Sequence, residues 1–169
     1  MIFGDPKELA VEVELEPELS ARFMGKEPLG RIRAWIDGIS FGDWEDPSCP
    51  FSGLAEELQE KADASYVAWH PSLEPKAPLE RFQTVDDLIY NPSFADGISG
   101  TLDLSTIFTN TVECFDGTKA FALTPSEGFV QILTSNQIDK FAYIVVDRDV
   151  IQQIGIGLKD WILANRRDA

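Results

Sequence analysis

Apolar and polar residues alternate along residues 9–15. The odd-numbered positions are all Leu or Val, whereas the even-numbered positions are Ala10, Glu12 and Glu14. A period of two is typical of a strand with one buried face. Pro17 follows and cannot continue the pattern. The sequence therefore predicts a half-buried strand over residues 9–15 that stops before Pro17.

Two further strands are predicted on either side of the dipeptide Asp37-Gly38. Residues 29–36 and a segment ending at Phe41 are rich in apolar positions. Asp-Gly between apolar runs favours a two-residue type I′ hairpin turn. That turn places Ile36 opposite Ile39, and Ala34 opposite Phe41.

The other face of this hairpin is predicted to be polar, since it carries Arg31, Arg33 and Trp35. When the strand over 9–15 is placed beside the strand over 29–36, Glu12 and Glu14 lie across from the two arginines. Opposite charges paired across strands contribute roughly 0.2–1 kcal/mol each. We therefore expect an outer sheet face that is charged but locally balanced.

Three segments have apolar residues at helical spacing. The first covers residues 52–69, with Ser52 as the expected N-cap. A short helix is expected to follow, capped by Thr84 and closed by Asn91-Pro92. The last helix is predicted from about Asp149 to Asn165. It contains two glycines, each costing up to about 1 kcal/mol relative to Ala, so either tight packing requires them or the helix is shorter.

The second half repeats the hairpin pattern around Asp116-Gly117. Residues 106–115 and 118–124 are expected to pair, with Val112 opposite Phe121 and Cys114 opposite Lys119. Segments 129–134 and 141–146 are two more predicted strands. Hairpin connections imply antiparallel pairing. The predicted fold class is therefore α+β: an antiparallel sheet of about six to seven strands built from hairpins, with two to three helices packed on it, in a single domain over residues 1–169.

The composition is strongly acidic. The chain has 29 Asp and Glu against 14 Lys and Arg, a net charge of −15, and 44% hydrophobic residues. Nucleic acid and anionic lipid surfaces would repel this charge, so neither is an expected partner, whereas a basic protein is. No apolar run approaches the ~18 residues of a membrane helix, and the start lacks signal-peptide features. We expect a cytoplasmic protein.

Residues that carry common catalytic or metal chemistry are scarce. The chain has two cysteines, Cys49 and Cys114, and one histidine, His70. These cannot form a Cys/His zinc cluster, and no glycine-rich phosphate loop is present. We expect both cysteines to be free thiols, Cys114 being buried, and His70 to interact with a helix end. The sequence assigns no catalytic, cofactor-binding or metal-binding residue, and no cofactor.

Carboxylates are numerous enough to keep an enzyme as the alternative. Clusters occur at residues 43–46, 86–87 and 147–149. A small carboxylate-dependent hydrolase would need two acids facing each other across a cleft, one with a raised pKa. Spacing alone does not show such a pair, and Asp147 and Asp149 are better explained as caps of the last helix. A scaffold subunit of an unknown complex is a third hypothesis.

Two tryptophans have charged surroundings. Trp35 lies on the charged face of the first hairpin, and Trp44 lies within the sequence Gly-Asp-Trp-Glu-Asp. Aromatic residues surrounded by charge are common anchors of protein interfaces, although a covering loop or helix could also bury them. The candidate binding residues are therefore Trp35, Asp43, Trp44, Glu45 and Asp46.

The first 46 residues resemble a known family. The opening MIFGDP, the strand over 9–15 and the stretch LGRIRAWIDGISFGDWED at 29–46 are similar to immunity proteins of bacterial polymorphic toxin systems, in the family numbered forty-two. The matching hairpin positions run from Gly30 to Trp44. The strand over 120–123 and the last helix fit the family's layout more loosely.

The resemblance implies a binding protein rather than an enzyme. Such a protein would protect the producing cell by occluding a cognate protein toxin. The acidity is an independent indication of a basic partner, because toxins that cut nucleic acid present basic clefts. The sequence gives no oligomeric state, and the family provides no functional residues to transfer.

Overall fold

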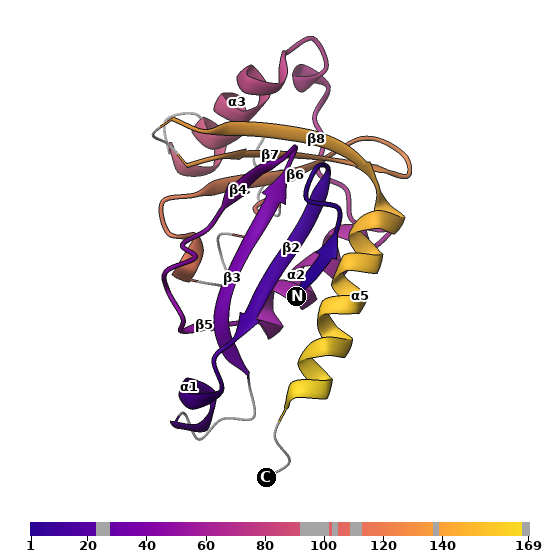
Figure 1. The fold of residues 1–169 in the computed structure, drawn as a ribbon. Helices are drawn as coiled ribbons and strands as arrows, with labels where there is room; N and C mark the ends of the chain where they lie inside the picture. Colours follow the sequence, from indigo (N-terminus) through magenta and orange to yellow (C-terminus); the bar gives the residue numbers. More distant parts are fainter. Residues whose placement is uncertain (23–27, 92–101, 103–104, 109–112, 137–138, 167–169) are drawn as a thin grey trace.

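A computed structural model shows how these elements assemble (Figure 1). It describes residues 1–22, 28–91, 102, 105–108, 113–136 and 139–166. Within them lie four α-helices and eight strands in two antiparallel sheets, one of five strands and one of three. The α+β class and the antiparallel pairing are confirmed. The described strands form two sheets rather than the single sheet that was predicted.

The five-stranded sheet, here sheet A, contains the first predicted hairpin. Its strands are β1 (Ile2–Gly4), β2 (Leu9–Leu15), β3 (Leu29–Ile36), β4 (Ile39–Phe41) and β5 (Cys49–Pro50). Asp37 and Gly38 both have positive φ, 50° and 76°, as a type I′ turn requires. The predicted register is confirmed, with Ile36 opposite Ile39, and Glu12 opposite Arg33. Strands β1 and β5 were not predicted.

The three-stranded sheet, sheet B, consists of β6 (Lys119–Ser126), β7 (Phe129–Ser135) and β8 (Phe141–Asp147). The predicted hairpin at Asp116-Gly117 is wrong. Only Gly117 has positive φ there, and the turn closes the 3₁₀ helix η3 (Glu113–Phe115), which contains Cys114. Phe121 forms an isolated bridge with Thr106, while Val112 lies outside the described residues.

The helices differ from prediction mainly at their ends. They are α1 (Pro17–Arg22), α2 (Ser52–Ala62), α3 (Pro78–Tyr90) and α5 (Arg148–Asn165), with a 3₁₀ turn η1 (Pro71–Leu73). Phe51, not Ser52, is the N-cap of α2, which ends seven positions earlier than predicted. Thr84 lies inside α3, where its hydroxyl donates to the Glu80 carbonyl. Pro17, predicted only to stop a strand, begins α1, a position that suits proline.

Two apolar layers hold the sheets and helices together. The larger lies between the inner face of sheet A, the lower face of sheet B, and helices α2 and α5. The smaller lies between the opposite face of sheet B and α3, and includes Phe82, Phe121 and Leu133. No helix of the described residues crosses the outer face of sheet A (Figure 1). The short helix α1 lies at one end of the sheet. The outer face is therefore the exposed side of the sheet.

The two glycines of α5 lie in close packing, and the helix runs its full predicted length. A Cβ at Gly155 would come 3.2 Å from Gln59 Cγ and 3.3 Å from Leu58 Cβ, both on α2. A Cβ at Gly157 would come 3.0 Å from the Phe3 ring on β1. Helix α5 thus packs tightly against both α2 and the edge strand of sheet A.

Candidate functional site

Arg33 occupies the centre of the outer face of sheet A. Its Nε donates to Glu12 Oε2 over 2.7 Å, and Trp35 Nε1 donates to the same oxygen over 2.9 Å. The guanidinium carbon lies 4.7 Å from the ring centroid of Trp35 and 4.3 Å from that of Trp44. We call Glu12, Arg33, Trp35 and Trp44 the aromatic platform. Its charges are neutralised internally, and its tryptophans stack on a cation.

The pKa of Glu12 depends on its burial and on its contacts with Arg33 and Trp35. Burial of the carboxyl group opposes its ionisation, but the hydrogen bonds from Arg33 and Trp35 and the Arg33 charge outweigh it. The pKa of Glu12 therefore lies below its ordinary value. At neutral pH the platform contains a carboxylate fully engaged with its own sheet.

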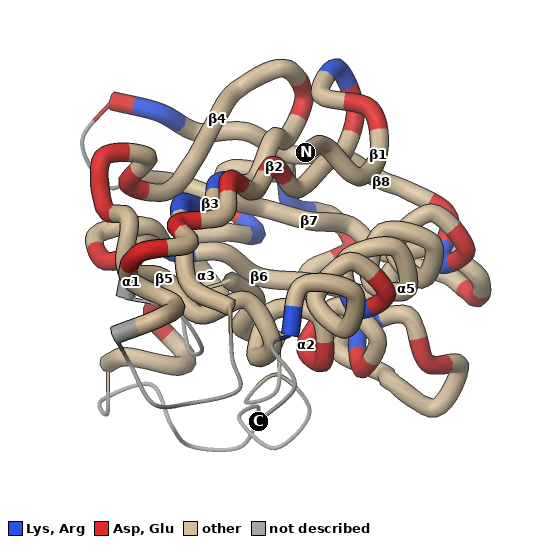
Figure 2. The backbone as a smooth tube through the Cα atoms, turned by 60° about the horizontal axis from the view of Figure 1, so that its bottom comes forward, with Lys and Arg blue, Asp and Glu red and all other residues tan. Residues whose placement is uncertain are grey.

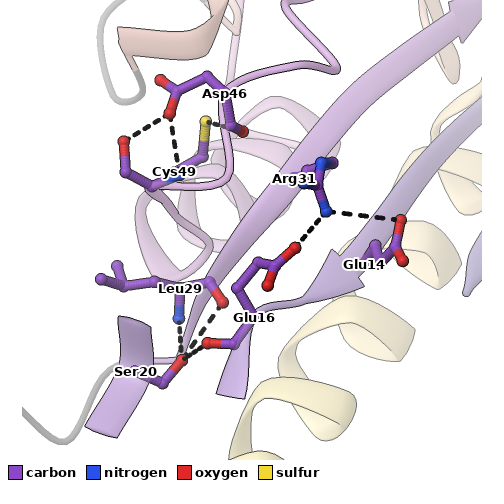
Figure 3. A network of polar contacts seen from close by, with 8 residues as sticks. Glu14, Glu16, Ser20, Leu29, Arg31, Asp46 and Cys49 are labelled. Atoms are coloured by element: carbon purple, nitrogen blue, oxygen red, sulfur yellow. Dashed lines mark hydrogen bonds and ion pairs between the residues drawn. The ribbon is translucent and has the colours of Figure 1, made fainter. Parts of the chain in front are cut away.

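Arg31 (Figure 3) lies two residues before Arg33 on β3 and therefore on the same face of the sheet. Its guanidinium points between Glu16, with which it is hydrogen-bonded, and Glu14, whose Oε2 is 4.0 Å away. Below it, Ser20 Oγ accepts from the Leu29 amide and donates to the Glu16 carbonyl, which ties α1 to β3. The arginines of this face are thus engaged by the protein's own acids.

The segment of residues 42–48, here the acidic loop, lies beside the platform. It is held by its own carboxylates: Asp43 Oδ1 accepts from the Glu45 amide, and Asp46 Oδ1 accepts from the Ser48 amide, both over 2.9 Å. The Ser48 hydroxyl and amide lower the pKa of Asp46. None of the ion pairs found among the described residues involves Asp43, Glu45 or Asp46. The loop therefore presents uncompensated negative charge.

Contacts at both ends fix the acidic loop. Gly42 has φ +106°, and a Cβ there would come 3.0 Å from the Phe115 ring, so glycine is required. The Asp43 amide donates to the Cys114 carbonyl over 2.6 Å. At the other end Cys49 Sγ lies 3.8 Å from the Asp46 carbonyl (Figure 3). Both cysteines are buried free thiols in contact, and contact with Cys49, together with burial, raises the pKa of Cys114.

The structure brings the five predicted residues into one region. Trp35 and Trp44 meet through Arg33, while Asp43, Glu45 and Asp46 follow in the acidic loop. Both tryptophans are half-buried rather than covered. Sequence reasoning placed Arg33 and Glu12 opposite each other but did not include them in the site. The alternation of Arg33 and Trp35 on one strand, with Glu12 across from them, was the available signal.

A shallow groove lies where the acidic loop meets sheet B. It has a volume of about 230 Å³, and its polar lining includes Asp43, Asp116, Asn136 and Lys140. Lys140 Nζ is 3.5 Å from the Ser40 carbonyl, so the turn before β8 approaches the end of β4. The groove joins the outer face of sheet A to the edge of sheet B.

Charge is spread unevenly over the rest of the molecule. Acidic positions outnumber Lys and Arg along α2 in Figure 2, whereas α5 carries Arg148 and Lys159 as well as Asp149 and Asp160. Several of the described basic residues are already engaged: Lys119 pairs with Asp86 over 2.5 Å, and Arg148 donates to the Tyr66 carbonyl over 2.7 Å. The acidic loop is distinguished by lying next to two half-exposed tryptophans.

The described residues offer no obvious catalytic arrangement. The pKa values of Glu12, Asp46 and Asp63 are all shifted downward, the opposite of what a general acid needs. No three His, Cys, Asp or Glu side chains in this part of the chain gather as metal ligands. His70 caps η1, its Nδ1 accepting from the Ser72 amide. Likewise, no described helix is long and apolar enough to cross a membrane.

Comparisons with known proteins agree with this geometry. No curated protein sequence matches the chain. Among solved structures, CdiI from Burkholderia dolosa AUO158 has a similar fold, with a TM-score of 0.68 and 11% sequence identity, over 95% of this chain and 99% of that one. The family model described as Immunity protein 42 matches residues 1–161. This chain therefore belongs to the Immunity protein 42 family.

Proposed function

We propose that this chain neutralises a cognate protein toxin by binding it, without catalysing a reaction, in the cytoplasm of the cell that produces both. The observation that carries the proposal is the juxtaposition of the aromatic platform with the unpaired acids of the acidic loop. Aromatic anchors beside uncompensated charge are typical of tight, rapidly formed protein interfaces. Family membership supports the same function.

The partner surface is expected to be basic. In a chain with a net charge of −15, Asp43 and Glu45 are exposed and Asp46 is half-buried, and none of the three forms an ion pair with another described residue. A toxin that acts on nucleic acid needs a basic cleft, which these carboxylates would occupy in place of phosphates. The proposed partner is therefore a basic, nuclease-type toxin, and neither nucleic acid nor membrane is a partner.

The alternative of a carboxylate-dependent hydrolase would use the groove lined by Asp43 and Asp116. Two features favour binding instead. The groove is shallow and is lined by Lys140 as well as acids, and Asp46 of the neighbouring loop is stabilised as a carboxylate. A scaffold subunit would differ from an immunity protein only in its partner.

The test is co-expression with the toxin domain encoded beside this gene, followed by measurement of association rates. Wild type should protect the cell and bind the toxin. The variant Asp43→Asn/Glu45→Gln/Asp46→Asn should associate at least about tenfold more slowly at low salt and lose most of its salt dependence.

A matched control is Glu56→Gln/Asp87→Asn/Asp160→Asn, which makes the same change in net charge on the exposed faces of α2, α3 and α5. Its association rate should stay within about threefold of wild type, because local charge dominates steering. Equal effects of the two triple variants would remove the acidic loop from the interface. A wild-type protein that neither binds nor protects would contradict the immunity function itself.

A further inference from the structure

Arg31 and Arg33 form a natural pair for comparison. Both lie on the outer face of β3, their side chains are 27% and 26% exposed, and both pair with glutamates of the neighbouring segment. They differ in one respect. Arg33 lies over the rings of both Trp35 and Trp44, whereas none of the cation–π contacts of the described residues involves Arg31.

This contact joins the side chains of two different segments. Trp35 belongs to the rigid centre of sheet A, whereas Trp44 belongs to the acidic loop. Glu12 fixes the Arg33 guanidinium from one side, and the flat guanidinium then supports the Trp44 ring at 4.3 Å. A ring held in this way loses little freedom on binding, and such preorganisation slows dissociation.

We infer that Arg33 is a positioning residue that holds Trp44, together with Trp35, as a preformed anchor for an apolar side chain of the toxin, while the acidic loop receives the toxin's basic side chains. This inference rests on the proposed function. It specifies the chemistry of the partner: an apolar side chain next to basic ones. The internally neutral platform suits an apolar side chain, and the unpaired loop carboxylates suit basic side chains.

The experiment compares Arg33→Lys with Arg31→Lys. Each keeps the positive charge and a donor for its glutamate, but lysine cannot present a flat surface to two rings. Dissociation of the toxin complex is measured at high salt, where steering is screened. Arg33→Lys should dissociate about tenfold faster than wild type and Arg31→Lys within about twofold, with association rates of all three alike.

Two further measurements separate positioning from a general structural effect. In the free protein, acrylamide quenching of Trp44, taken as the difference between each protein and its Trp44→Phe counterpart, should rise in Arg33→Lys and not in Arg31→Lys. In the complex, Arg33→Lys added to Trp44→Ala should accelerate dissociation no further, because its effect passes through that ring.

The outcomes distinguish the two ideas. If wild type fails to bind the toxin, the proposed function fails, while unchanged Trp44 quenching in Arg33→Lys overturns the positioning role without any toxin. If wild type binds and both lysine variants dissociate at the same rate, or the effects of Arg33→Lys and Trp44→Ala simply add, the inference is wrong and the immunity function stands.

Discussion

Sheets A and B are exposed to very different surroundings. Sheet B is covered by the main core on one face and, over β6 and β7, by α3 on the other, whereas β8 leaves Tyr143 and Val145 exposed. Sheet A buries one face and leaves the other without a covering helix among the described residues, with buried and half-buried positions alternating along β3. Strands β6 and β7 are therefore mainly a structural layer, whereas sheet A keeps a whole face that is only half-buried.

The difference shows how an acidic protein can keep arginines beside its binding residues. On sheet A the acids that face an arginine form ion pairs with it: Glu12 pairs with Arg33, and Glu16 pairs with Arg31. Asp43, Glu45 and Asp46, which form none of the ion pairs found among the described residues, lie in the adjacent acidic loop. The sheet holds the tryptophans in place, which favours slow dissociation, and the loop provides negative charge, which favours fast association. Neighbouring segments therefore serve the two properties of a fast, tight interface.

Phe121→Ala should produce the largest loss of stability. Phe121 is fully buried in sheet B and lies 5.2 Å from the Phe82 ring of α3, so truncation leaves a cavity in the smaller core. We expect the free energy of unfolding in urea to fall by about 3–5 kcal/mol. Trp35→Ala, on the half-exposed side of sheet A, should cost clearly less. Equal losses would contradict the contrast between the two sheets.

The two Asp-Gly turns should respond differently to alanine. Asp37 has φ +50°, a left-handed conformation that Asp tolerates better than Ala, whereas Asp116 is not among the residues with positive φ. Asp37→Ala should therefore lower the free energy of unfolding by about 1 kcal/mol, and Asp116→Ala by less than about 0.5 kcal/mol. Thermal or urea unfolding of both variants tests this, and a reversed order would disprove the assignment of turn types.

Glu12→Gln should have an effect of about the same size as Asp37→Ala, but one that depends on pH. We expect a loss of about 1 kcal/mol at pH 7, because the variant keeps an oxygen but loses the charge that holds Arg33. The folded protein holds the Glu12 pKa below its ordinary value of 4.5, so this stabilisation is present above that pH and is lost as the pH falls through the lowered pKa.

Urea unfolding of Glu12→Gln and wild type at neutral and strongly acidic pH therefore checks the sign. The two proteins should differ at pH 7 and converge in acid. Glu14→Gln is the control, since Glu14 is 58% exposed and 4.0 Å from Arg31, and it should change little at either pH. A deficit in Glu12→Gln that persists in acid would mean that packing, not charge, stabilises the platform.

All three strands of sheet B were predicted, but the sequence predicts the pairing of strands better in sheet A, for a physical reason. In the first hairpin, strict alternation and a turn with two positive φ values specify the same register, so β2, β3 and β4 follow together. Before Asp116 no alternation fixes the pairing, and the same dipeptide closes a 3₁₀ helix instead. The true β6–β7 turn uses Glu127-Gly128, with Gly128 at φ +81°.

The end of α2 shows where periodicity misleads. Tyr66 and Trp69 continue the helical spacing of Leu54 and Leu58, yet the helix ends at Ala62. Tyr66 reaches the core through its hydroxyl, which donates to the Ala122 carbonyl over 2.6 Å, a tertiary contact that no local pattern contains. Trp35 and Trp44 could each be predicted from the sequence as candidate binding residues. Their shared contact with Arg33 could not be predicted, because it depends on the path of the acidic loop.

The contact between Gly157 and Phe3 has a consequence for how the protein is made. Strand β1, the outermost of sheet A, leaves the ribosome early, yet the helix that packs on it is translated after both sheets. Contacts of such long sequence separation form late and slow the folding of the chain. The packing of α5 against the edge of sheet A is therefore completed only after translation has passed α5.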